Sequence, residues 1–183
     1  MVLLVSHAGL VSAGQMFALA IYGGALIATF VASAVYHLAP WHALRPALRR
    51  IDHAAIYLKI AGTYTPLVVM VGTTFAYLIL AIVWGLAAIG ITLKLFFWQT
   101  PGRFGPLLYL IMGWLSVFLI WSVWSVLPGL ALVLIAVGGL TYTVGVVFYK
   151  SEKPFTTAVW HGFVVVASAC FWAAIMIGAM AGG

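Results

Sequence analysis

Six long apolar runs constrain the fold of this chain more than any other feature of its sequence. They cover about residues 15–37, 53–71, 75–97, 106–126, 128–149 and 155–180. Each run is close to the roughly 20 residues that an α-helix needs to cross the hydrocarbon of a bilayer. Hydrophobic residues make up 66% of the 183 positions and charged residues only 5%, so little is left for a soluble domain. We therefore predict an all-α integral membrane protein with one domain over residues 1–183, a bundle of six transmembrane helices.

Two smaller features refine this expectation. Residues 1–14 are apolar but too short to cross a bilayer, so we interpret them as an N-terminal stub or re-entrant piece. The pairs Gly23-Gly24 and Gly138-Gly139 lie inside apolar runs. They predict close contacts between helices, because glycine lets two backbones approach each other.

Basic residues lie on alternate connections between the six runs. The second and fourth connections have none, while the first, third and fifth hold or adjoin Arg45, Arg49, Arg50, Lys94, Arg103, Lys150 and Lys153. Six spans therefore place these residues on one side of the membrane, which the positive-inside rule identifies as the cytoplasmic side. Lys59 fits the same orientation if its long side chain reaches back to the interface. The net charge of +6 suits anionic lipid head groups, and we expect membrane lipids and not nucleic acid as partners.

Polar residues that are scarce elsewhere gather at one depth of the predicted bundle, near its cytoplasmic surface. Ser33 and His37 lie four residues apart at the end of the first span, and Thr157 and His161 lie four apart at the start of the last. A spacing of four puts both members of a pair on one helix face. Asp52, one of only two carboxylates in the chain, begins the second span at the same depth. Because ionisable side chains inside a membrane usually face one another or a watery cavity, we predict a polar pocket here.

The chemistry of this pocket suits a divalent metal. Two imidazoles and a carboxylate favour zinc with an open position for water, and we predict His37, His161 and Asp52 as its ligands. Zinc-bound water can become hydroxide near neutral pH and attack a carbonyl. Asp52 is then also a catalytic candidate as proton acceptor, and Ser33 is one as a donor to the water or to a developing oxyanion. His53 is ambiguous, because it points about 100° away from Asp52 if the helix has begun, and we predict it as a possible residue of the pocket.

Each of these residues also has a structural interpretation. Ser33 could bond to a carbonyl one turn earlier, Asp52 could cap the N-terminus of the second span, and the two histidines could lie half-solvated at the interface. The gathering of these groups at one depth favours the pocket.

Several segments carry a resemblance to a known family. They are "SAVYH", "RRIDHAAIYLKIAGTYTP", "MGWLS", "GGLTYTVGVVFY" and "AVWHGFVVVASAC". In this order and spacing, from about Tyr22 to Cys170, they resemble the hemolysin III family, the bacterial relatives of the progestin and adipoQ receptors. The resemblance implies a seven-helix membrane fold, of which six spans and a stub are a degenerate form. Either the protein has six spans, or the sequence begins at an internal methionine.

The resemblance also implies a site. The family's serine, histidine and aspartate pattern falls on Ser33, His37 and Asp52, and its final histidine pair falls on positions 157 and 161. In the family three histidines bind zinc, but Thr157 stands where one of them is expected. A third ligand would have to come from Asp52 or His53. A water-filled polar pocket that includes Thr157 is the alternative.

The function that the resemblance implies is membrane-lipid homeostasis in a bacterial inner membrane, with hydrolysis of a lipid amide or ester by a zinc-dependent enzyme. The missing histidine keeps a second hypothesis open. In that hypothesis the chain is a non-catalytic accessory or lipid-sensing subunit that packs against a larger membrane complex.

Overall fold

The computed structural model describes residues 12–97, 104–149 and 154–181. Within these ranges it contains six helical segments that are long and apolar enough to cross a membrane, which confirms the predicted all-α bundle. The elements are α2 (Ala13–Leu38), the 3₁₀ turn η1 (His42–Leu44), α3 (Arg45–Val71), α4 (Thr74–Phe96), α5 (Phe104–Trp114), η2 (Leu115–Leu119), α6 (Ile120–Trp124), α7 (Gly129–Tyr149) and α8 (Thr156–Ala181). The fourth span is formed by α5, η2 and α6 together. Most of the predicted N-terminal stub lies outside the described residues.

Local sequence explains where several helices begin and end. At the start of α2, the Ser12 hydroxyl accepts from the backbone of Gln15, whose side chain accepts from the backbone of Ser12; this is a capping box. Gly72 ends α3 with a φ of +69°, a left-handed conformation that glycine adopts without a steric penalty. Thr73 then caps α4 through its hydroxyl. A two-residue connection at this end of the bundle therefore reverses the chain.

The second span begins earlier than the run 53–71 suggests. α3 starts at Arg45, with Pro46 in its first turn, a position where proline costs no hydrogen bond. Arg49, Arg50 and Asp52 are therefore part of a helix that extends the apolar span at its polar end, and Asp52 is not an N-cap. The apolar run marks the part of the helix at hydrocarbon depth, whereas the helix itself continues beyond it.

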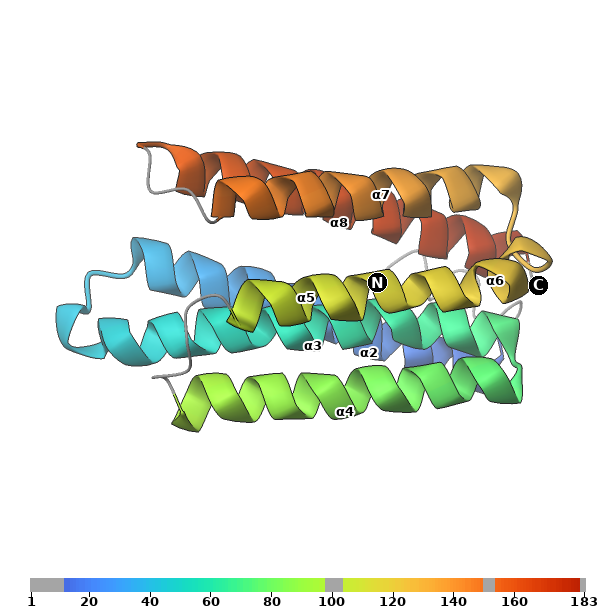
Figure 1. The fold of residues 1–183 in the computed structure, drawn as a ribbon, viewed down its shortest axis with the longest axis horizontal. Helices are drawn as coiled ribbons and strands as arrows, with labels where there is room; N and C mark the ends of the chain where they lie inside the picture. The colour runs from blue at the N-terminus through green and yellow to red at the C-terminus, as the bar shows by residue number, and fades with distance from the viewer. Residues whose placement is uncertain (1–11, 98–103, 150–153, 182–183) are drawn as a thin grey trace.

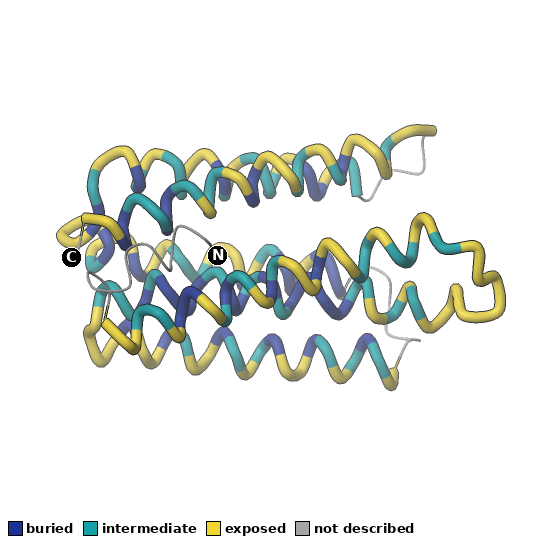
Figure 2. Tube along the Cα trace, turned by 180° about the vertical axis from the view of Figure 1, so that it is seen from behind, coloured by how far each residue is buried: buried dark blue, intermediate teal, exposed yellow. Residues whose placement is uncertain are grey.

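The helix α3 lies at the centre of the bundle. It packs against α2 and α4 and also contacts α5, α6 and α8, whereas α7 packs chiefly against α8 (Figure 1). Its side chains form much of the main core, including the fully buried Tyr57 and Val68. The outer faces of the other helices are exposed (Figure 2) and carry large apolar residues such as Trp121. Such a surface is suited to lipid and not to water.

Glycine brings helices together at positions that differ in part from those predicted. A Cβ atom added at Gly62 of α3 would lie 2.7 Å from the Cβ of Ala25 in α2, so the two helices meet closely there. Gly138 also meets its neighbour closely, as predicted, because an added Cβ would lie 3.3 Å from a backbone oxygen of α8. The prediction is wrong for three others, which have no described atom within 4 Å of an added Cβ: Gly23, Gly24 and Gly139.

Candidate functional site

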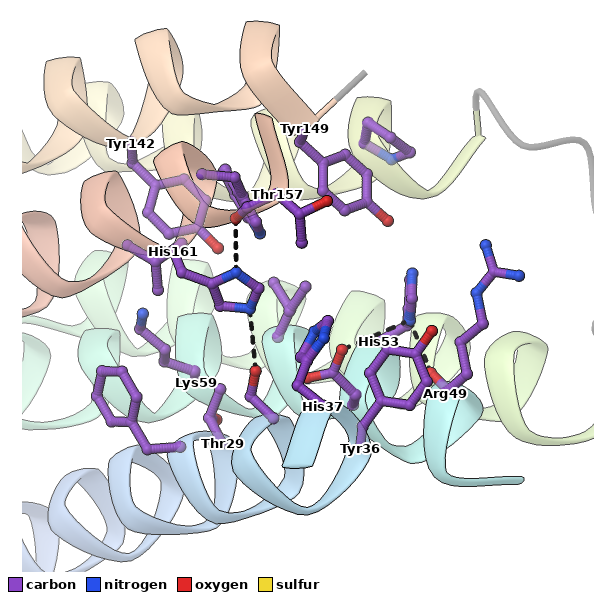
Figure 3. Close-up of a pocket in the computed structure, with 17 residues that line it drawn as sticks. Thr29, Tyr36, His37, Arg49, His53, Lys59, Tyr142, Tyr149, Thr157 and His161 are labelled. Carbon is purple, nitrogen blue, oxygen red and sulfur yellow. Dashed lines mark hydrogen bonds and ion pairs between the residues drawn. The ribbon is translucent and has the colours of Figure 1, made fainter. Parts of the chain in front are cut away.

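A cavity of about 810 Å³ opens at the end of the bundle where α2 ends and α8 begins. Its walls come from five helices, α2, α3, α5, α7 and α8, so it lies between the α7–α8 pair and the central helices (Figure 3). Every site residue predicted from the sequence lines this cavity: Ser33, His37, Asp52, His53, Thr157 and His161. Residues more than a hundred positions apart in the chain therefore meet, in agreement with their common depth in the predicted spans.

His161 makes two hydrogen bonds in the cavity wall. Its Nδ1 lies 2.7 Å from the backbone oxygen of Thr157, and its Nε2 lies 3.1 Å from the hydroxyl oxygen of Ser33 (Figure 3). A carbonyl oxygen can only accept a hydrogen bond, so Nδ1 carries the hydrogen. The neutral ring then presents a lone pair at Nε2, and the Ser33 hydroxyl donates to it. This bond ties α2 to α8 across the cavity.

Ser33 differs in this from other hydroxyl side chains of the bundle. Thr29, one turn earlier on α2, donates 2.8 Å to the backbone oxygen of Ala25, and Ser168 donates 2.6 Å to that of Val164. Both follow the usual pattern of hydroxyls in apolar helices. Ser33 instead points across the cavity to an imidazole.

His37 stands beside this pair. The centroid of its ring lies 4.8 Å from that of His161, and the two planes meet at 88°. The ring is exposed at the mouth of the cavity and also contacts the ring of Tyr36 at 4.5 Å between centroids. Two imidazoles that approach edge to face provide a polar wall, with His161 on the inner side and His37 on the outer.

Asp52 and His53 form a second group in the cavity wall. His53 donates from Nδ1 to the backbone oxygen of Arg49 at 2.7 Å. The same nitrogen lies 3.9 Å from a carboxylate oxygen of Asp52. The helix thus turns His53 into the same cavity as Asp52.

The residues present do not fit a zinc ion held by three protein side chains. Within the described residues, no three His, Cys, Asp or Glu side chains come together in a group that could hold a metal. At position 157, four residues before His161 on α8, Thr157 offers a hydroxyl, which is a weak ligand for zinc compared with imidazole. Zinc on His37, His161 and Asp52 therefore stays a prediction from the sequence.

Lys59 is the most unusual of the cavity residues that are not among the predicted site residues. Lys59 lines the cavity and is only 5% exposed, so the expectation that its side chain reaches back to the interface is wrong. Its Nζ has no hydrogen-bond partner among the described residues. It lies 5.5 Å from the ring centroid of Phe30 and 5.4 Å from that of Tyr142. The sequence does carry a signal for this position, because Lys59 follows Asp52 by seven residues and hence lies on the same helix face.

Comparison with known proteins gives a consistent result. Residues 1–172 match the family model described as Haemolysin-III related. The chain is 35% identical to the hemolysin-3 homolog of Bacillus subtilis (strain 168) over 90% of its own length and 78% of that protein. It is 35% identical to hemolysin-3 of Bacillus cereus over 90% and 76% of the two lengths. It is also 34% identical to the human monocyte to macrophage differentiation factor over 85% and 67%. No solved structure matches the chain.

Proposed function

This chain belongs to the haemolysin-III related family, and from that premise we propose that its cavity binds a membrane lipid and hydrolyses an ester or amide bond in it. The observation that carries the proposal is the hydrogen-bonded series from Ser33 through His161 to the backbone of Thr157 inside the cavity. A serine or a water molecule next to a neutral imidazole can lose its proton to that ring as it attacks a carbonyl.

The cavity walls suit an amphiphile. Phe30, Ile56 and Val164 provide apolar surface for an acyl chain, while Ser33 and His161 provide polar groups for the bond to be cleaved. A volume of about 810 Å³ falls in the range of roughly 300–1,000 Å³ that is common for small-molecule sites. The exposed apolar side chains on the outside of the bundle suit contact with lipid, so a lipid substrate would lie next to the protein.

We further propose that the cavity opens toward the cytoplasm of a bacterial inner membrane. Arg45, Arg49 and Arg50 lie in the first two turns of α3, at the same end of the bundle as the cavity mouth. Basic residues close to the ends of spans favour the cytoplasmic side. Lipids of the inner leaflet would then be the substrates.

Lipid analysis of the purified protein tests the proposed reaction. The chain is reconstituted in nanodiscs of bacterial total lipid, and release of free acyl chains is followed by mass spectrometry. His161→Ala should lower release by about 100-fold or more, the usual contribution of a general base. His42→Ala is the matched control, because His42 lies in η1 outside this cavity and its loss should leave the rate unchanged. No product from any lipid class would contradict the proposal.

The metal content of the same preparation tests the zinc prediction. About one equivalent of zinc that is lost in a His37→Ala variant would support it. Hydrolysis by protein that elemental analysis shows to be metal-free would exclude a requirement for zinc.

The presence of Thr157 in place of a third histidine favours a second candidate function, a non-catalytic lipid-sensing or accessory subunit of a larger membrane complex. The large exposed apolar faces could pack against such a partner as well as against lipid. This candidate predicts co-purification with one defined partner in mild detergent. It also predicts that His37→Ala leaves this association intact.

A further inference from the structure

We propose that Ser33 is the nucleophile of the cavity, with His161 as its general base and the amino group of Lys59 as the donor that stabilises the oxyanion. This inference rests on the proposed hydrolysis and names the groups that carry it out. It starts from a disagreement, since the family resemblance implies three zinc-binding histidines whereas the described side chains provide a serine, an imidazole and a buried lysine in one cavity.

The hydrogen bonds of His161 suit a general base. Because Nδ1 donates to the backbone oxygen of Thr157 at 2.7 Å, the ring is held in the tautomer whose Nε2 can accept a proton. That nitrogen lies 3.1 Å from the Ser33 oxygen, within the distance at which a base can take the serine proton. In serine hydrolases a third group orients the base, and here the backbone of α8 does so, one helical turn before the ring.

Lys59 is placed to stabilise the negative oxygen that forms when a serine attacks a carbonyl group. The tetrahedral intermediate carries a negative oxygen, which a preorganised donor in a site shielded from water stabilises strongly. Lys59 lines the same cavity, is 5% exposed and has no hydrogen-bond partner among the described residues. A lysine at this depth is costly, and the rings of Phe30 and Tyr142 satisfy it only in part. The amino group of Lys59 can therefore donate hydrogen bonds to a ligand in the cavity.

The proposed reaction requires only these groups, the lipid and water. The Ser33 oxygen forms a bond to the carbonyl carbon of a lipid ester or amide as its proton moves to Nε2 of His161. The oxyanion collapses, the bond to the leaving oxygen or nitrogen breaks, and His161 returns the proton to that leaving group. Water then attacks the acyl-serine by the same route, which releases a carboxylic acid and restores the Ser33 hydroxyl.

Covalent labelling tests this proposal separately from lipid turnover. A fluorophosphonate with a long alkyl chain reacts with an activated serine and not with a metal-bound water. In nanodiscs with EDTA present, the full chain should gain one phosphonyl group, and peptide mapping should place it on Ser33. Ser33→Ala should remain unlabelled. Ser168→Ala should label like the wild type, because Ser168 already donates within its own helix.

Two further variants separate the roles of the partners. His161→Ala should slow labelling about 100-fold. Lys59→Met should slow it about 100-fold as well, as expected for loss of an oxyanion donor, whereas Lys94→Met, outside the cavity, should not.

The outcomes distinguish this inference from the proposed function. If Ser33 is not labelled in the wild type, or if Ser33→Ala still cleaves lipid, the nucleophile assignment is wrong while hydrolysis stands. The assignment is also wrong if chelation abolishes hydrolysis and zinc restores it. Labelling of Ser33 without any lipid cleavage would uphold the nucleophile and overturn the lipid substrate.

Discussion

Replacing Lys59 by methionine should stabilise the fold even though it removes a residue that we place in the function. Methionine keeps much of the length of the side chain and removes the charged end, which has no hydrogen-bond partner among the described residues. A cation at the centre of a membrane helix costs about 2.5–3.5 kcal/mol on insertion scales. Contacts with the rings of Phe30 and Tyr142 return about 0.5–1 kcal/mol each. The difference predicts a gain in stability of about 0.5–2.5 kcal/mol for Lys59→Met.

Equilibrium unfolding in bicelles by steric trapping measures this gain directly. Lys94→Met is the matched control, because Lys94 is also buried, at 8% exposure, but has interactions of its own in the fold. The same substitution there should leave stability unchanged or lower it. A loss of stability of more than about 1 kcal/mol in Lys59→Met, outside the range worked out above, would refute the reasoning, since it would mean that the folded protein satisfies the Lys59 amino group.

Three further predictions concern the packing that holds the cavity walls in place, and the same unfolding assay checks each. Gly62→Ala should lower stability by about 1–3 kcal/mol, because the new methyl group would lie 2.7 Å from the Cβ atom of Ala25. Gly24→Ala is the control and should be neutral or slightly stabilising, because an added Cβ there lies in open space. Equal losses in the two variants would contradict the close contact at Gly62. Tyr64→Phe should cost about 1–2 kcal/mol, because the Tyr64 hydroxyl lies 2.7 and 2.9 Å from two backbone oxygens of α5. Thr29→Val should cost about 1 kcal/mol, since its hydroxyl also lies 3.0 Å from a backbone oxygen of α3; an unchanged variant would show that the α2–α3 contact does not depend on this bond.

The bundle and the meeting of the predicted site residues in one cavity can be predicted from the sequence because a membrane fixes depth. The length of each apolar run places its ends at the two surfaces, so residues at the same distance from an end lie level whichever helix carries them. Depth alone therefore groups Ser33, Asp52 and His161, and all three line the cavity. This grouping requires no knowledge of which helices are neighbours.

Rotation about each helix axis is harder to predict, because one residue of error turns a side chain by about 100°. Gly24 is predicted at a helix contact and lies at none, whereas Gly62 makes a close contact that the sequence does not single out. Because the side chain of Lys59 is long and flexible, it is predicted to reach the membrane interface. Its spacing of seven residues from Asp52 instead places it on the face of α3 that forms the cavity wall. The direction of the Lys59 side chain is therefore predicted better from its spacing to Asp52 than from its residue type.

The tautomer of His161 shows why a pattern of residue types does not determine mechanism. A serine and a histidine at the same depth are equally compatible with a metal-bound water that the serine orients and with a serine that attacks directly. The hydrogen bond from Nδ1 to the backbone oxygen of Thr157, which any residue at that position would provide, leaves the Nε2 lone pair available in both mechanisms, because Nε2 can bind a metal or accept the serine proton. What separates the two is whether a third ligand stands beside His37 and His161. Replacing Thr157 by histidine would therefore keep this hydrogen bond and add a third imidazole beside His37 and His161. If the chain then bound zinc and lost its reactivity toward the fluorophosphonate, the choice between the two mechanisms would rest on that single side chain.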